Sequence, residues 1–109
     1  MDKRTNNIIK YYVAAVAKER RGLLKAYLFG SYARKTDNPS SDIDIALVID
    51  NLKDDDKFDL QVQLMLLASK FDTRIEPHPV SKEDFDSSNP FIAEIKKNCV
   101  EIAMPVLTA

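Results

Sequence analysis

Apolar residues recur at helical spacing in two segments of the chain. Over Thr5–Arg21 they fall at Ile8, Ile9, Tyr12, Val13 and Val16. Residues three and four apart lie on one side of a helix, so the pattern predicts an amphipathic helix that ends near Gly22. Residues 57–71 repeat this spacing and predict a helix that packs on a sheet. The apolar positions of the second segment are Leu60, Leu64, Leu67 and Ala68.

Four other segments have patterns that are typical of strands. The run LLKAYLF at 23–29 contains bulky and aromatic residues that favour a buried strand. Residues 41–50 are apolar and β-branched after the first three positions, which suits a strand covered on both faces. Residues 73–80 alternate in polarity, but Pro77 and Pro79 restrict them to a short or edge strand. Residues 99–104 are candidates for a last short strand.

The segments between these runs complete the expected order of elements. Residues 30–35 are compatible with one helical turn, residues 36–41 are mostly turn formers, and residues 84–98 are mostly helical in pattern. Helices thus alternate with strands, and the order predicts an α/β or α+β fold with helices against a small sheet. At 109 residues the chain is long enough for one domain, residues 1–109, and too short for two.

Composition narrows the class of protein only slightly. A net charge of -1 shows no overall basic excess of the kind that is common in nucleic-acid binders, so we expect no direct nucleic-acid binding. The only cysteine, Cys99, excludes an internal disulfide and fits a reducing compartment. No apolar run approaches the length that crosses a membrane, and the first residues lack a signal peptide pattern. We therefore expect a cytoplasmic protein.

The only histidine, His78, has no second histidine with which to form a zinc site. We expect its side chain to face solvent or to form a local hydrogen bond rather than to carry out acid–base chemistry.

The strongest chemical signal is a pair of acids at the start of an apolar strand. Asp42 and Asp44 are two residues apart, so their side chains lie on the same face of a strand. Two adjacent carboxylates repel each other and resist desolvation, and a bound Mg²⁺ ion removes that conflict. The same pair alone is as well explained by a turn cap and an exposed strand edge. Gly30 and Ser31 favour the metal-site interpretation, because a glycine followed by a helical turn forms a binding site for phosphate close to the two acids in sequence.

These residues together resemble the signature of a known family. Gly30-Ser31, a ten-residue spacer and Asp42-Ile43-Asp44 are similar to the motif of the nucleotidyltransferases of the DNA polymerase β-like superfamily. Length and layout resemble the minimal nucleotidyltransferases (MNT) that act as antitoxins beside HEPN-domain toxins. The resemblance covers nearly the whole chain and implies a polymerase β palm-like fold with a small mixed sheet.

The resemblance also implies roles for individual residues. Asp42 and Asp44 match the two metal-binding aspartates of the family. Glu76 is the best match for the third carboxylate, and Asp72, at the predicted helix–strand junction, is the second candidate. A surface acid paired with Arg74 is the alternative explanation of Glu76.

The triphosphate side of the motif is matched by three residues. Gly30 and Ser31 correspond to the residues that hold the triphosphate. Arg34 either contacts phosphates or braces the loop, and the sequence favours neither.

The activity that the resemblance implies is transfer of AMP from ATP, with two Mg²⁺ ions held by Asp42, Asp44 and Glu76. The implied acceptor is a tyrosine hydroxyl of a partner HEPN toxin, which the modification would block. One alternative is a binding module of the same fold that neutralises its partner by steric occlusion. Another is an enzyme that modifies a small molecule, although the chain has no second domain to enclose such an acceptor. Association into homo- or hetero-oligomers is also possible.

Overall fold

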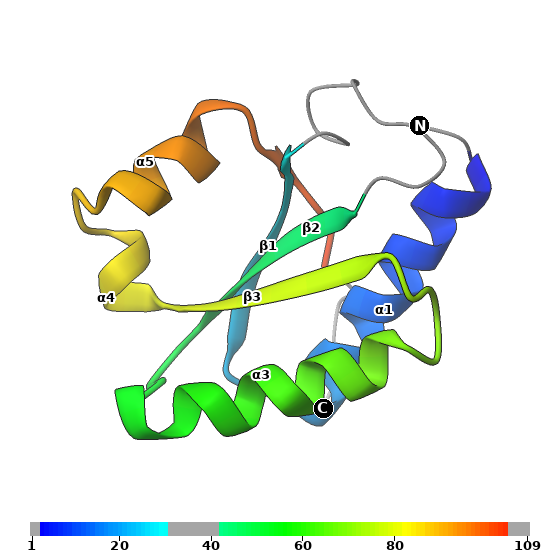
Figure 1. The fold of residues 1–109 in the computed structure, drawn as a ribbon, viewed down its shortest axis with the longest axis horizontal. Helices are drawn as coiled ribbons and strands as arrows, with labels where there is room; N and C mark the ends of the chain where they lie inside the picture. The colour runs from blue at the N-terminus through cyan, green and yellow to red at the C-terminus, as the bar shows by residue number, and fades with distance from the viewer. Residues whose placement is uncertain (1–2, 31–41, 105–109) are drawn as a thin grey trace.

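The computed structural model of the chain describes residues 3–30 and 42–104. Its elements form a four-stranded sheet with helices on both faces (Figure 1). The helices are α1 Lys3–Glu19, α3 Asp54–Ala68, α4 Lys82–Phe85 and α5 Pro90–Lys97. The strands are β1 Leu23–Phe29, β2 Ile43–Ile49, β3 Ile75–Ser81 and β4 Val100–Glu101.

The sheet is mixed, as the family resemblance implies. Its strand order is β3-β2-β1-β4. β1 runs antiparallel to both β2 and β4, whereas β2 and β3 are parallel. β3 lies at the edge of the sheet, which confirms the prediction from Pro77 and Pro79, because an edge strand leaves one row of backbone groups without a neighbouring strand.

The two faces of the sheet have different partners. Alternate residues of β2, namely Ile43, Ile45, Leu47 and Ile49, are buried in a core with α1 and α3. The opposite face carries Ala46, which packs with Val80 of β3 and with Ile92 and Ile95 of α5. Side chains two residues apart on a strand share a face, so Asp44 lies on the α5 side of the sheet.

The segment predicted as one helix over 84–98 is two helices. α4 ends at Phe85 and α5 begins at Pro90. The Asn89 side chain accepts a hydrogen bond of 2.8 Å from the backbone N–H of Phe91, and Pro90 occupies the first helical turn, where it loses no hydrogen bond. A helix start at this point excludes a continuous helix through residues 86–89.

The other boundaries differ by a few residues. α1 and α3 each begin and end two or three residues before the predicted bounds, and β4 covers only Val100–Glu101 of the predicted 99–104. Among the described residues no helix has both the length and the apolar character needed to span a membrane.

Candidate active site

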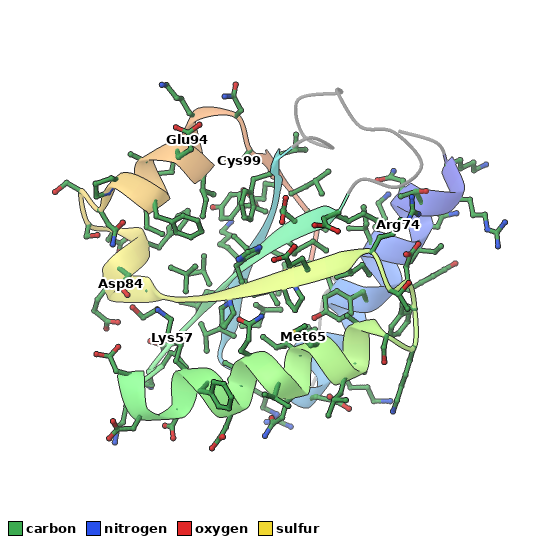
Figure 2. All side chains as sticks on the ribbon, in the orientation of Figure 1. Lys57, Met65, Arg74, Asp84, Glu94 and Cys99 are labelled. Carbon is green, nitrogen blue, oxygen red and sulfur yellow. The ribbon has the colours of Figure 1, made fainter. Side chains whose placement is uncertain are left out.

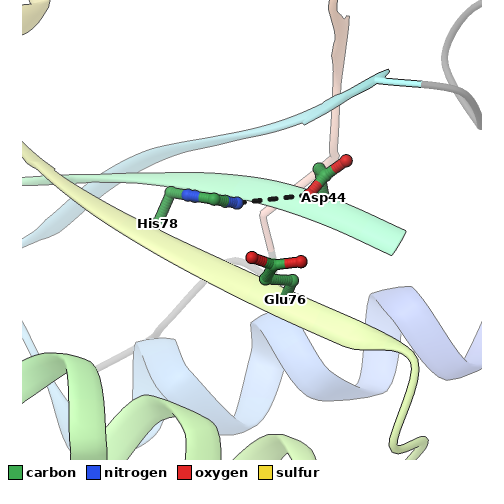
Figure 3. Close-up of side chains that lie close together, drawn as sticks. All are labelled: Asp44, Glu76 and His78. Atoms are coloured by element: carbon green, nitrogen blue, oxygen red, sulfur yellow. Dashed lines mark hydrogen bonds and ion pairs between the residues drawn. The ribbon is translucent and has the colours of Figure 1, made fainter. Parts of the chain in front are cut away.

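The parallel pairing of β2 and β3 brings two acids together. Asp44 and Glu76 are direct partners in the register of the two strands. His78 follows Glu76 by two residues and lies on the same face. Figure 3 shows the three side chains gathered over the sheet, with the imidazole of His78 directed at Asp44.

The three side chains are close enough to share one ligand. One donor atom from each of Asp44, Glu76 and His78 lies within 4.8 Å of the other two. The shortest contact joins His78 Nε2 to Asp44 Oδ1 at 3.2 Å. The side chains of Asp44 and His78 are 23% and 27% exposed, so the group is partly shielded from solvent but still accessible.

The acids of this group interact unfavourably with one another. Burial raises the pKa of Glu76 above its ordinary value, and the carboxylates of Asp44 and Asp42 raise it further, whereas His78 acts in the opposite direction. Asp42 is exposed and directly precedes β2. Carboxylates that resist ionisation together are stabilised by a divalent cation, so the donor set fits Mg²⁺ or a similar ion.

Asp72, the second candidate for the third carboxylate, is bound elsewhere. Its Oδ1 accepts hydrogen bonds from the backbone N–H and Nε of Arg74, and its Oδ2 accepts one of 2.8 Å from Nη2. The hydrogen bonds from Arg74 hold the pKa of Asp72 below its usual range. Arg74 lies at the start of β3 (Figure 2), so this pair braces the turn that leads into the strand. Glu76 is therefore the better candidate.

Gly30 directly follows β1 and lies against Asp44. Its backbone has a φ of 74°, a conformation that glycine adopts without strain. A Cβ atom at this position would clash with Asp44 Oδ2. Glycine is thus needed here for the placement of the carboxylate, in addition to any approach of phosphate. Ser31 and Arg34, the other predicted nucleotide ligands, lie outside the described residues, as does most of the predicted helical turn at 30–35.

His78 is the site residue that the sequence interpretation missed. It neither faces open solvent nor bonds locally, but contacts an acid 34 positions away in the chain. The available signal was its spacing of two from Glu76, which places both on one face of a strand. Its significance depends on the pairing of β3 with β2, which the sequence pattern does not specify.

Comparison with known proteins agrees with this geometry. The model of the family described as polymerase beta nucleotidyltransferase matches residues 12–102. A protein of Sulfolobus solfataricus assigned as a nucleotidyltransferase is 27% identical, with a TM-score of 0.66 over 90% of this chain and 78% of that one. Comparison with curated protein sequences found no match.

Two further solved structures share the fold. A chain of the toxin–antitoxin complex MntA–HpeT, in a variant form, is 26% identical, with a TM-score of 0.57 over 93% of this chain and 72% of that one. A chain of the complex between a tri-AMPylated Shewanella oneidensis HEPN toxin and an MNT antitoxin is 22% identical, with a TM-score of 0.50 over 87% and 71%. The family model covers most of the sequence and includes the paired acids of β2 and β3. The chain therefore belongs to the polymerase β nucleotidyltransferase family.

Proposed function

We propose that this protein transfers AMP from ATP to a tyrosine hydroxyl of a partner HEPN toxin and thereby acts as an antitoxin. The observation that carries the proposal is the direct pairing of Asp44 with Glu76 beside Gly30, where acids that destabilise one another surround a space suited to a cation. The likeness to a chain from a complex with a tri-AMPylated HEPN toxin supports a HEPN toxin as the proposed partner.

In this proposal the acids Asp42, Asp44 and Glu76 hold two Mg²⁺ ions. When bound, such ions neutralise charge on the phosphates and lower the pKa of the attacking hydroxyl. Gly30 leaves room for the Asp44 carboxylate. Ser31 and Arg34 are proposed as triphosphate ligands from the family motif alone. Glu76, whose pKa is raised, is suited to accept the proton of the acceptor hydroxyl.

The reaction is a substitution at the α-phosphorus of ATP. The tyrosine oxygen forms a bond to the α-phosphorus, the bond to the bridging oxygen breaks, and pyrophosphate leaves. The toxin gains one AMP group for each hydroxyl that reacts.

A comparison of two aspartate variants tests this assignment. The protein is incubated with its proposed partner, a HEPN toxin, together with Mg²⁺ and ATP labelled at the α-phosphate. We expect the wild type and Asp55→Asn, a control on the exposed start of α3, to label the toxin equally. Asp44→Asn should reduce labelling by about 100-fold or more, since it removes electrostatic stabilisation of the transferred group. Equal labelling by Asp44→Asn would show that the proposed site is wrong.

Steric occlusion without transfer is a second candidate, and one observation favours it. α3 exposes Phe58, Met65 and Leu66, which are 76%, 51% and 63% accessible, and such a helix face is suited to contact with a protein. Under this reading Asp44→Asn neutralises the toxin as well as the wild type does, and no label is transferred. Growth of cells that express the toxin with each variant separates the two functions.

A further inference from the structure

The candidate metal group contains a nitrogen donor beside its carboxylates. Asp44 and Glu76 offer oxygen atoms, and His78 offers an imidazole nitrogen on the same face of the sheet. All three atoms lie within 4.8 Å of one another, and Figure 3 shows the ring of His78 and both carboxylates around a common space. A purely electrostatic role in holding Mg²⁺ would need only the oxygen atoms.

Two aromatic rings hold the imidazole in place. The ring of Phe29 meets that of His78 edge to face, with centroids 5.1 Å apart. The ring centroids of His78 and of Phe91, in α5, are 6.2 Å apart. These contacts limit the rotation of the His78 side chain and leave Nε2 directed at Asp44. A donor with restricted rotation loses less entropy when it binds a ligand.

The separation of the two nearest donors is suited to a shared ion. His78 Nε2 and Asp44 Oδ1 are 3.2 Å apart. Neighbouring ligands of an octahedral ion, each about 2.1 Å from the metal, lie about 3.0 Å from one another. The distance between these two atoms is therefore close to that between adjacent ligands of one ion.

We propose that His78 Nε2 is a direct ligand of the divalent ion held by Asp44 and Glu76, and that the site prefers a first-row transition ion such as Mn²⁺ to Mg²⁺. The inference rests on the proposed metal site but not on the identity of the acceptor. Imidazole is a better ligand for transition ions than for Mg²⁺, which favours oxygen. The third donor thus changes the selectivity of the site as well as its affinity.

Electron spin echo envelope modulation of the Mn²⁺-loaded 109-residue chain, free of any histidine tag and of nucleotide, tests the inference. His78 is the only histidine in the sequence, so imidazole nitrogen coupling can come from no other residue. We expect that coupling in the wild type and its loss in His78→Gln. Titration should show that this variant binds Mn²⁺ at least about 10-fold more weakly, while Mg²⁺ affinity changes less.

The controls separate failure of this inference from failure of the proposed site. Asp44→Asn should abolish tight Mn²⁺ binding, and Asp55→Asn should leave both the affinity and the nitrogen coupling unchanged. Mn²⁺ that depends on Asp44 but shows no nitrogen coupling in the wild type would overturn the role of His78 and reduce it to a hydrogen-bond partner of Asp44. Mn²⁺ binding that survives Asp44→Asn would overturn the metal site itself. The wild-type spectrum decides the question even if His78→Gln does not fold.

Discussion

At the scale of single residues, the site depends on close contacts between groups that are far apart in sequence. Asp44 touches Gly30 on one side and His78 on the other, and it pairs with Glu76 across two strands. Asp44 could be identified from the sequence, because it follows Asp42 by two residues inside an apolar run. The contacts to Gly30 and His78 could not, because they depend on strand register and on where β1 ends.

Gly30→Ala should damage both the backbone and the metal site. Alanine at a positive φ costs roughly 1–2 kcal/mol, and its Cβ would displace the Asp44 carboxylate. We expect a lower melting temperature and at least about 10-fold weaker Mn²⁺ binding, measured by thermal unfolding and by titration.

Gly22→Ala is the matched control for that substitution. Gly22 has no positive φ and lies against the backbone of Asp50, at the other end of β2. The Gly22→Ala variant should differ from the wild type in stability but should bind Mn²⁺ with the same affinity. Wild-type Mn²⁺ binding by Gly30→Ala would contradict the contact with Asp44.

Glu76→Gln should stabilise the metal-free protein at pH 7. The folded-state pKa of Glu76 is raised by burial and by neighbouring carboxylates, so ionised Glu76 opposes folding above that pKa. The advantage of glutamine should disappear as the pH falls below the ordinary glutamate pKa of 4.5, because wild-type Glu76 is then protonated. The difference in melting temperature between the variant and the wild type is measured by thermal unfolding at pH values from about 4 to about 7.

An exposed glutamate provides the comparison. Glu83 lies on the solvent side of α4, and Glu83→Gln should change the melting temperature little at either pH. A lower melting temperature for metal-free Glu76→Gln at pH 7 would mean that the Glu76 carboxylate is stabilised in the fold, which contradicts the account of the site.

At the scale of elements, a buried hydrogen bond joins α1 to α3. Tyr12 of α1 is fully buried, and its hydroxyl donates a hydrogen bond of 3.0 Å to the backbone carbonyl of Leu64 in α3. Burial raises the pKa of this hydroxyl. The contact fixes the packing of two helices that cover one face of the sheet beneath the site.

Tyr12→Phe should lower the free energy of unfolding by about 1 kcal/mol, because the buried hydrogen bond from the Tyr12 hydroxyl to the Leu64 carbonyl is lost. Tyr11→Phe is the matched control, since Tyr11 is 64% exposed on the same helix and should have almost no effect. Urea denaturation of the two variants measures the difference. Equal stability of Tyr12→Phe and the wild type would show that the Tyr12 hydrogen bond contributes nothing to the stability of the fold.

The elements themselves were more predictable than their ends. Apolar spacing identified α1, α3 and the strands of the sheet, because that spacing is what each element buries. The break between α4 and α5 was missed, although Asn89-Pro90 is a typical helix start. The apolar spacing of Phe91, Ile92 and Ile95 belongs to α5 alone. It therefore gives no support for the part of the predicted helix that precedes Pro90.

At the scale of the whole molecule, one face of the sheet both packs against α5 and carries the candidate metal ligands. Near α5 it is apolar, with Ala46, Val80, Ile92 and Ile95 in contact. The same face carries Asp44, Glu76 and His78 (Figure 3). Phe29 has ring contacts with both His78 and Phe91, so it lies between the apolar part of this face and the candidate metal ligands.

The mixed sheet that makes this arrangement was expected only from the family resemblance. Apolar patterns predict that strands exist, but they do not determine which strands pair or whether pairs are parallel. The pairing of β2 with β3 is the step that turns two distant acids into one candidate site.

The central claim is that this site transfers a nucleotide, and the position of the label in ATP tests it most directly. The protein is incubated with its proposed partner, a HEPN toxin, together with a divalent cation and ATP labelled at either the α- or the γ-phosphate. We predict that the toxin acquires the α-label and not the γ-label, that pyrophosphate is released, and that Asp44→Asn reduces both events by about 100-fold or more. Incorporation of the γ-label, or α-labelling by Asp44→Asn at the wild-type level, would contradict the account.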